Sequence, residues 1–313
     1  MTGGDWRPHA ARLAEKMRRQ GLDDPAWVEA FATVPRHVFV GGDSIDDDGQ
    51  PVDTAGWDRR QLLRQSYADR VIVTRFREVD GVRVATSSVS QPAIVAIMLR
   101  LLDVADGCRV LEIGTGPGYN AALLCARLGD ADVTTMDLQA DVAADARKTL
   151  ERLGFRPHIA VGDGALGCPA RAPFDRVIAT CGLDAVPPSW LDQLAPGAKV
   201  LAPMNFGGAL ATLERVGADT LVGGFAAERG YFMELRHDAG VRHTPRVNPL
   251  GDMPADLQLW TELCRASATP VAGDWHAHGE PGRDRFGYTV TRTRQWVWLD
   301  SPDSGVRWEL QSQ

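Results

Sequence analysis

The chain is poor in lysine and cysteine, and it lacks any long apolar segment. Only three of its 34 basic residues are lysine, and the net charge of −7 leaves no clustered positive surface for a nucleic acid. Its 5 cysteines form no C-x-x-C pair, which argues against a zinc site or a redox dithiol. No apolar run reaches the roughly 18 residues of a membrane span, and the N-terminus has no signal-peptide core. These absences predict a cytoplasmic protein with neither a nucleic-acid nor a membrane partner.

A glycine-rich turn between an apolar strand and a helix is the most informative motif. Residues 109–113 are typical of a strand buried in a parallel sheet, and residues 119–128 of a helix. Between them, Gly114, Gly116 and Gly118 follow the pattern G-x-G-x-G. Glycine permits a positive φ and the close approach of a ligand, and the amides at the start of the helix point towards that ligand. The turn is therefore a candidate nucleotide-binding site.

Acidic residues at strand ends narrow the choice of ligand. Glu112 precedes the first glycine by two residues, where it would repel a pyrophosphate but suit the cationic amino-acid end of S-adenosylmethionine. Asp137 ends a predicted strand and can accept hydrogen bonds from ribose hydroxyls. Asp163 follows another strand and could hold the adenine amino group. The candidate cofactor-binding residues are Glu112, Gly114, Thr115, Gly116, Gly118, Asn120, Asp137, Leu138, Asp163 and Gly164.

Other functions fit parts of this pattern less well. A nicotinamide-dependent oxidoreductase would also use a strand, a glycine turn and an acid, but the third glycine of the G-x-G-x-x-G fingerprint is missing and Glu112 disfavours a pyrophosphate. A non-catalytic peptide-binding module would need a disrupted cofactor turn, whereas this turn is intact. His276 and His278 have no evident third partner, so no metal site is predicted.

The order of the expected elements indicates an α/β fold. Strands and helices alternate over residues 109–202, which predicts a doubly wound, Rossmann-like parallel sheet. Apolar residues at helical spacing predict two N-terminal helices, over 8–20 and from Pro25. Residues 41–58 hold four glycines and six aspartates and are expected to form a polar, mobile loop.

The pattern changes after about residue 216. Antiparallel strands, a helix over 254–266 and a hairpin over 296–310 are expected there. Five of the 9 tryptophans lie in residues 260–308, which favours a packed core over a partner surface. The chain is accordingly divided into N-terminal helices with an acidic loop, a cofactor-binding core, and an α+β extension that recognises the substrate, at residues 1–80, 81–216 and 217–313.

Three serine hydroxyls, from Ser87, Ser88 and Ser90, precede an apolar helix expected over 93–102. Serine commonly caps helix N-termini, and composition alone favours that role over contact with a substrate.

Several segments, taken in order, resemble the protein-L-isoaspartate O-methyltransferases: Val34-Pro-Arg36, residues 86–92, 110–119, 162–164, 172–175 and Gln193-Leu194. The resemblance covers about residues 25–216. It implies a class I S-adenosylmethionine-dependent methyltransferase fold and transfer of a methyl group to a carboxyl of a peptide or protein that bears aspartate or isoaspartate. It also implies that Ser88 and Ser90 lie at the catalytic site, where Ser90 matches the serine of the family best.

The chain continues for about 100 residues beyond the expected sheet, whereas enzymes of the family usually end shortly after it. In this respect it resembles an extended subgroup associated with ribosomally synthesised peptides of the lanthipeptide or graspetide type. Those relatives methylate an unmodified aspartate of a cyclised precursor peptide, and the ester collapses to an aspartimide that can hydrolyse to isoaspartate. A general repair methyltransferase acting on isoaspartyl proteins is the alternative.

Overall fold

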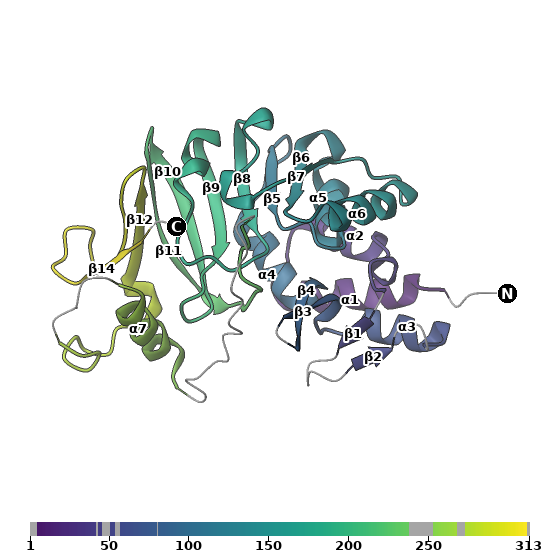
Figure 1. Cartoon of the computed structure of the whole chain (residues 1–313), viewed down its shortest axis with the longest axis horizontal. Coiled ribbons are helices and arrows are strands. Elements are labelled where there is room, and N and C mark those ends of the chain that lie inside the picture. Colours follow the sequence, from purple (N-terminus) through teal and green to yellow (C-terminus); the bar gives the residue numbers. More distant parts are fainter. Residues whose placement is uncertain are drawn as a thin grey trace. The chain divides into compact units, whose positions relative to one another are not determined.

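The computed structural model describes residues 5–41, 43–45, 51–53, 57–79, 81–237, 253–267 and 273–311. The chain divides into two compact units. Figure 1 shows their helices and strands. The first unit comprises Met1–Cys108 and Gly114–Gly162, and the second comprises Arg109–Ile113 and Asp163–Gln313. Over the described residues, no helix is both long and apolar enough to cross a membrane, and no group of three side chains could hold a metal ion.

The first unit contains the helices expected from the sequence and one further helix, α3, that was not expected. Its helices are α1 (Arg7–Arg19), α2 (Pro25–Thr33), α3 (Arg59–Ser66), α4 (Pro92–Leu102), α5 (Tyr119–Leu128) and α6 (Ala140–Arg152), with short 3-10 turns η1 (Arg36–Val38) and η3 (Asp130–Asp132). Its strands are β1 (Asp43–Ile45), β2 (Pro51–Asp53), β3 (Ile72–Val79), β4 (Val82–Val89), β6 (Val133–Asp137) and β7 (His158–Val161).

Local sequence explains where these helices begin and which face they bury. Asp24 accepts a hydrogen bond from the Ala26 amide at 2.8 Å and so caps α2, whose first residue is proline. The predicted apolar stripe of α1 is confirmed, since Leu13 and Met17 are buried. Helix α5 carries four consecutive side chains with no exposure and forms the core of this unit, Ala121, Ala122, Leu123 and Leu124.

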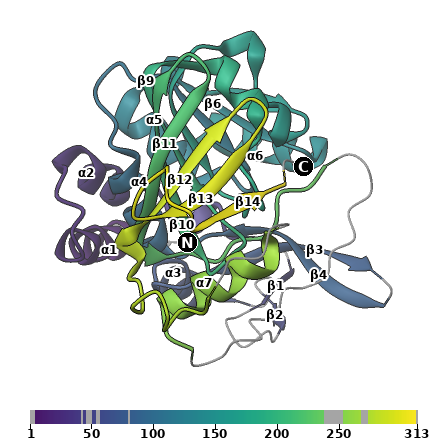
Figure 2. The same cartoon turned by 90° about the vertical axis from the view of Figure 1, so that its left-hand side faces the viewer.

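Two hairpins in the first unit differ from the expectation. The loop predicted over 41–58 is wrong for β1 and β2, which pair in antiparallel fashion. Aspartate and serine have little strand propensity, so this pairing depends on tertiary context, and β1 contacts β3. Residues 42, 46–50 and 54–56 of that segment lie outside the described residues. Strands β3 and β4 form a second hairpin, which extends as a two-stranded arm (Figure 2).

The second unit is built on a mixed sheet. Its strands lie in the order β5 (Val110–Ile113), β8 (Phe174–Ala179), β9 (Leu194–Pro203), β10 (Ala209–Gly217), β11 (Thr220–Arg229), β12 (Phe286–Thr291), β13 (Gln295–Leu299) and β14 (Arg307–Leu310). Strands β5, β8 and β9 are parallel, as predicted, and every pairing from β9 to β14 is antiparallel. In the first unit β6 and β7 are also parallel. The fold is that of a class I methyltransferase with additional C-terminal strands.

The C-terminal strands continue the sheet. The expected boundary between residues 216 and 217 falls inside the β10–β11 hairpin, and β11 pairs directly with β12. The hairpin expected over 296–310 is confirmed as β13 and β14. Helix α7 (Ala255–Ala266) contacts β14, and the rings of Trp260 and Trp308 meet edge to face at 4.9 Å. Both rings are buried, which confirms the core interpretation for these two tryptophans.

Candidate active site

The glycine turn has the backbone conformation that its composition predicts. Gly114, Gly116 and Gly118 have φ values of 102°, 51° and 97°, in the left-handed region that glycine enters without strain. The amides of Gly114 and Thr115 donate to the carbonyl of Met136 at 2.8 and 3.0 Å, which joins the turn to the end of β6. Bare Cα atoms and the amides at the start of α5 give this turn the shape of a ligand cradle.

Asp137 supports the turn directly. One carboxylate oxygen accepts from the Gly116 amide at 2.9 Å and the other from the Gln139 amide at 3.1 Å. The side chain is 9% exposed, so the carboxylate is held in a defined position at the end of β6. The position suits the predicted contact with ribose hydroxyls, which stays a prediction.

Three more predicted cofactor residues belong to the first unit. Thr115 is buried, and its hydroxyl shares a hydrogen bond of 2.7 Å with that of Thr135, which favours a structural role for this side chain. Asn120, in the first turn of α5, and Leu138, next to Asp137, are half-buried. Their contacts with a cofactor stay a prediction.

The other predicted cofactor residues belong to the second unit. Glu112 has no exposure within β5. Asp163 accepts from the Ala165 amide at 2.8 Å and lies 2.9 Å from Nδ1 of His237, a partner that no sequence pattern indicated. A Cβ on Gly164 would lie 2.5 Å from Cγ2 of Ile113, so close packing alone requires glycine at this position. The roles of these residues toward a ligand stay predictions.

The structure shows that the serines do not cap α4. The N-cap residue is Gln91, which makes no capping bond through its side chain. Asp69 caps the helix from a distant segment, since its carboxylate accepts from the Ala93 amide at 2.9 Å. Within the part of the chain that the structure describes, neither Ser88 nor Ser90 has a side-chain hydrogen bond. The capping interpretation is therefore wrong, and both hydroxyls are free to meet a ligand.

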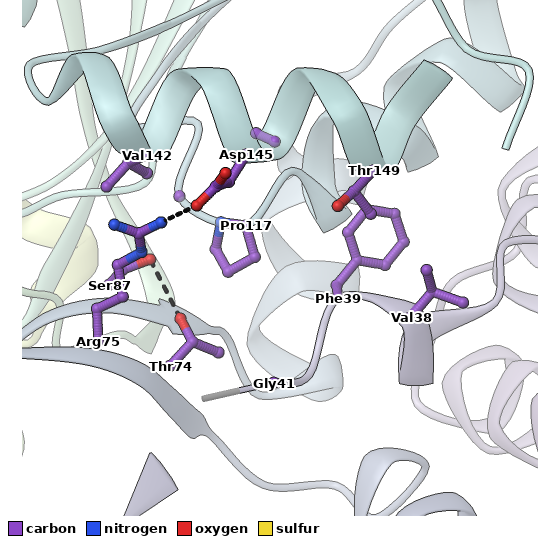
Figure 3. A pocket seen from close by; sticks show the side chains of 12 residues that line it. Val38, Phe39, Gly41, Thr74, Arg75, Ser87, Pro117, Val142, Asp145 and Thr149 are labelled. Atoms are coloured by element: carbon purple, nitrogen blue, oxygen red, sulfur yellow. Dashed lines mark hydrogen bonds and ion pairs between the residues drawn. The ribbon is translucent and has the colours of Figure 1, made fainter. Parts of the chain in front are cut away.

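Strand β4, the serine strand, carries Ser87 and Ser88 and lies directly against the glycine turn. A Cβ on Gly116 would be 3.6 Å from both the Ser87 hydroxyl and the Ser88 carbonyl oxygen. Ser87 pairs with Arg75 across the hairpin and faces a pocket of about 170 Å³ that Gly116 and Pro117 also line (Figure 3). Ser88 is not among the residues that line this pocket, because successive side chains of a strand point to opposite faces.

The Val34-Pro-Arg36 segment supports the start of α5 from the buried side. The Arg36 guanidinium has no exposure and donates to the carbonyls of Ser66 and Arg70, at 2.6 and 3.0 Å. It also lies 5.1 Å from the centroid of the Tyr119 ring, on the residue that follows Gly118. Burial lowers the pKa of Arg36 to about 10 and raises the pKa of Tyr119 to about 12. A cation–π contact thus ties this segment to the residue next to the turn.

The residues of the turn fit S-adenosylmethionine better than a dinucleotide. The Asp137 carboxylate accepts from the Gly116 amide and so places a negative charge beside the turn, where a second negative charge would be repelled. The positive φ of Gly116 and Gly118 allows a ligand to lie on bare backbone. A cationic methyl donor with a ribose is therefore compatible with these residues, and a pyrophosphate is disfavoured.

Comparison with known proteins identifies the family. The family model of protein-L-isoaspartate(D-aspartate) O-methyltransferase matches residues 9–222. Protein-L-isoaspartate O-methyltransferase 1 of Anaeromyxobacter sp. is 35% identical over 209 residues, which cover 66% of this chain and 85% of the relative. The enzyme of that name from Thermococcus onnurineus is 43% identical over 194 residues, covering 61% and 76%.

Solved structures show the same fold. A protein-L-isoaspartate O-methyltransferase aligns with a TM-score of 0.60 at 22% identity, over 96% of this chain and 87% of its own. A putative enzyme of this type from Plasmodium falciparum, in complex with S-adenosyl-L-homocysteine, aligns with a TM-score of 0.52 at 16% identity, over 73% and 99%. The chain therefore belongs to the protein-L-isoaspartate(D-aspartate) O-methyltransferase family, and its cofactor is S-adenosylmethionine.

Proposed function

We propose that the protein transfers a methyl group to the carboxylate of an isoaspartyl or aspartyl residue in a peptide or protein. The observation that carries the proposal is the contact between the glycine turn and the serine strand, at Gly116 and Ser88. It places the cofactor turn beside the strand that leads to the unpaired hydroxyls of Ser88 and Ser90. These hydroxyls do not cap α4, because Asp69 does so. The names of the curated relatives support the choice of an isoaspartyl carboxylate as the acceptor.

Methyl transfer requires that the acceptor carboxylate be held in line with the methyl group and that water be excluded from the site. S-adenosylmethionine supplies an electrophilic methyl group on a sulfonium. A carboxylate with an ordinary pKa near 4 is ionised at neutral pH, so its attack needs no general base. Ser88 and Ser90 would orient the acceptor by donating hydrogen bonds to one carboxylate oxygen and leaving the other free to react. One carbon–oxygen bond forms, one carbon–sulfur bond breaks, and the positive charge on sulfur is neutralised as the carboxylate loses its negative charge.

A second candidate substrate is an unmodified aspartate in a cyclised ribosomal precursor peptide. It is favoured by one observation, that the family model ends at residue 222 whereas the chain continues to residue 313. The fold of this C-terminal region is shared with a solved protein-L-isoaspartate O-methyltransferase, which aligns over 96% of this chain. An extension of this kind is therefore no mark of peptide maturation by itself, and we place the isoaspartyl substrate first.

Mass spectrometry on two synthetic peptides tests the proposal. They share one sequence and differ only in whether a single residue is isoaspartyl or aspartyl. We expect the isoaspartyl peptide to gain one methyl group, and then to lose methanol as the neighbouring backbone nitrogen closes a succinimide. Methylation of the aspartyl peptide alone would favour the second candidate. Methylation of neither peptide, with S-adenosylmethionine bound, would contradict a carboxyl methyltransferase that acts on linear peptides.

The nicotinamide alternative is tested by ligand-induced stabilisation. A ligand that binds only the folded state raises the melting temperature. We expect S-adenosylmethionine and S-adenosylhomocysteine to raise it and NAD to leave it unchanged.

A further inference from the structure

Arg75 cross-links two segments of the first unit. Its guanidinium contacts the Asp141 carboxylate at 2.5 Å through Nη1. Through Nη2 it contacts the Asp145 carboxylate, as Figure 3 shows. Arg75 lies on β3, and both aspartates lie on the first turns of α6. Hydrogen bonding from Lys148, followed by the charge and hydrogen bond of Arg75, lowers the pKa of Asp145, so this carboxylate stays ionised near neutral pH.

Arg75 lies on β3, and the strand paired with it, β4, carries Ser87 and Ser88. Arg75 pairs with Ser87 in the β3–β4 register, and the neighbouring Thr74 hydroxyl donates to the Ser87 hydroxyl at 3.2 Å. Ser87 in turn lies against Gly116, as described above. The double ion pair therefore ties β3 to α6, and β4 is held through its pairing with β3 while its Ser87 lies against the glycine turn.

We propose that Arg75 is a positioning residue for methyl transfer, whose clamp on Asp141 and Asp145 holds the serine strand at a fixed place beside the glycine turn. Ser88 follows Ser87 on β4, and its side chain points to the opposite face of the strand. Fixing the position of Ser87 therefore also fixes the position of the Ser88 hydroxyl, which would contact the acceptor carboxylate. The inference rests on the proposed function, because it takes Ser88 and Ser90 as contacts of the acceptor.

The clamp matters more for geometry than for folding. Arg75 has a side chain that is 32% exposed, and Asp141 and Asp145 are 67% and 56% exposed. Solvent-exposed pairs of this kind contribute little to stability. A small displacement of an acceptor-binding group can nevertheless cost a large factor in rate, because methyl transfer needs the reacting atoms in line.

The first test compares Arg75→Gln with Arg77→Gln. Arg77 is an exposed arginine on the same strand for which the described structure shows no ion pair, so it controls for the loss of one positive charge. With an isoaspartyl peptide as the probe, we expect Arg75→Gln to lower kcat/KM about tenfold and Arg77→Gln to leave it unchanged. Both variants should melt within about 2–4 °C of the wild type. Equal activity of the two variants would overturn the proposal.

The second test removes the clamp from the helix. The double substitution Asp141→Asn and Asp145→Asn should reproduce the loss seen in Arg75→Gln, and combining all three changes should add no further loss. Full additivity would mean that Arg75 acts on its own, which would contradict a clamp. Arg75→Lys keeps the charge but cannot contact both carboxylates in the same fork, so partial recovery is expected.

A third measurement does not depend on methyl transfer. Hydrogen exchange of the β4 amides should be faster in Arg75→Gln than in Arg77→Gln, because β4 loses its link to α6. If the β4 amides exchange faster in Arg75→Gln but the wild type methylates no peptide, the proposed function fails while the clamp stands. Unchanged exchange in Arg75→Gln together with unchanged kcat/KM would mean that the clamp fails.

Discussion

Replacing Asp69 by alanine removes the side chain that caps helix α4. The carboxylate accepts from the Ala93 amide at 2.9 Å and from Nζ of Lys16 at 2.7 Å. We expect Asp69→Ala to destabilise the fold while Ser90→Ala does not, although both residues lie near the start of the same helix. The pair of variants therefore separates capping from a role in the reaction.

The expected magnitude follows from the two contacts. Loss of an N-cap side chain costs about 1 kcal/mol. The ion pair adds at most about 1 kcal/mol, because the Lys16 side chain is 48% exposed. The sum of about 1–2 kcal/mol corresponds to a fall in Tm of about 3–6 °C for a unit of this size. Asp69→Asn keeps an oxygen that can accept from Ala93 and should show the smaller part of this loss.

Thermal unfolding and a methylation assay together distinguish a capping role from a role in the reaction. Ser90→Ala should melt within about 1 °C of the wild type, since its hydroxyl has no partner in the described structure. Its turnover should fall about 10-fold or more, because a hydrogen bond to a charged group contributes about 1.5–3 kcal/mol. If Ser90→Ala melted as low as Asp69→Ala, or kept full turnover, the assignment of the serine to the acceptor site would be refuted.

Three further outcomes are expected. Asp137→Ala should weaken binding of S-adenosylmethionine about 10-fold or more in calorimetry, because the turn loses the acceptor of the Gly116 amide and the ligand loses a carboxylate; unchanged affinity would contradict the predicted ribose contact. Burial lowers the pKa of His37 from 6.5 to about 4, so its contribution to stability is complete above pH 6.5 and falls by up to about 3 kcal/mol as the pH drops to about 4; His37→Gln should flatten the dependence of Tm on pH over that range. A Cβ at Gly287 would overlap the Trp298 ring, so Gly287→Ala should cost about 1–3 kcal/mol, measured by chemical unfolding, with a change in tryptophan fluorescence.

The sequence alone predicts the parts of the site that depend on neighbouring residues. Gly114, Gly116 and Gly118 adopt the backbone conformation that their spacing indicates, and Asp137 ends its strand as expected. Helix starts are equally local, as Asp24 shows at α2. Each of these features needs only a few consecutive residues, which is why periodicity and turn chemistry suffice to find them.

The features that the sequence did not reveal depend on residues far apart in the chain. The Asp69 cap joins residues separated by 24 positions, the contact of Arg75 with Asp145 spans 70, and that of His237 with Asp163 spans 74. The β3–β4 hairpin was missed because its polar residues do not alternate cleanly with apolar ones. Serines that precede a helix are typical N-caps, and only the structure shows that Asp69 caps α4 instead. The choice between capping and ligand contact therefore could not be made from composition.

The assignment of β5 has a consequence for how the protein can be dissected. This strand belongs to the second unit, whereas the chain on both sides of it belongs to the first. The backbone therefore passes from one unit to the other three times, after Cys108, after Ile113 and after Gly162. A single cut after Gly162 would leave all of the first unit in one piece, whereas the fragment that begins at Asp163 would leave the edge of β8 without β5, its partner. The second unit can therefore acquire its full set of strands only when the N-terminal part of the chain is also present.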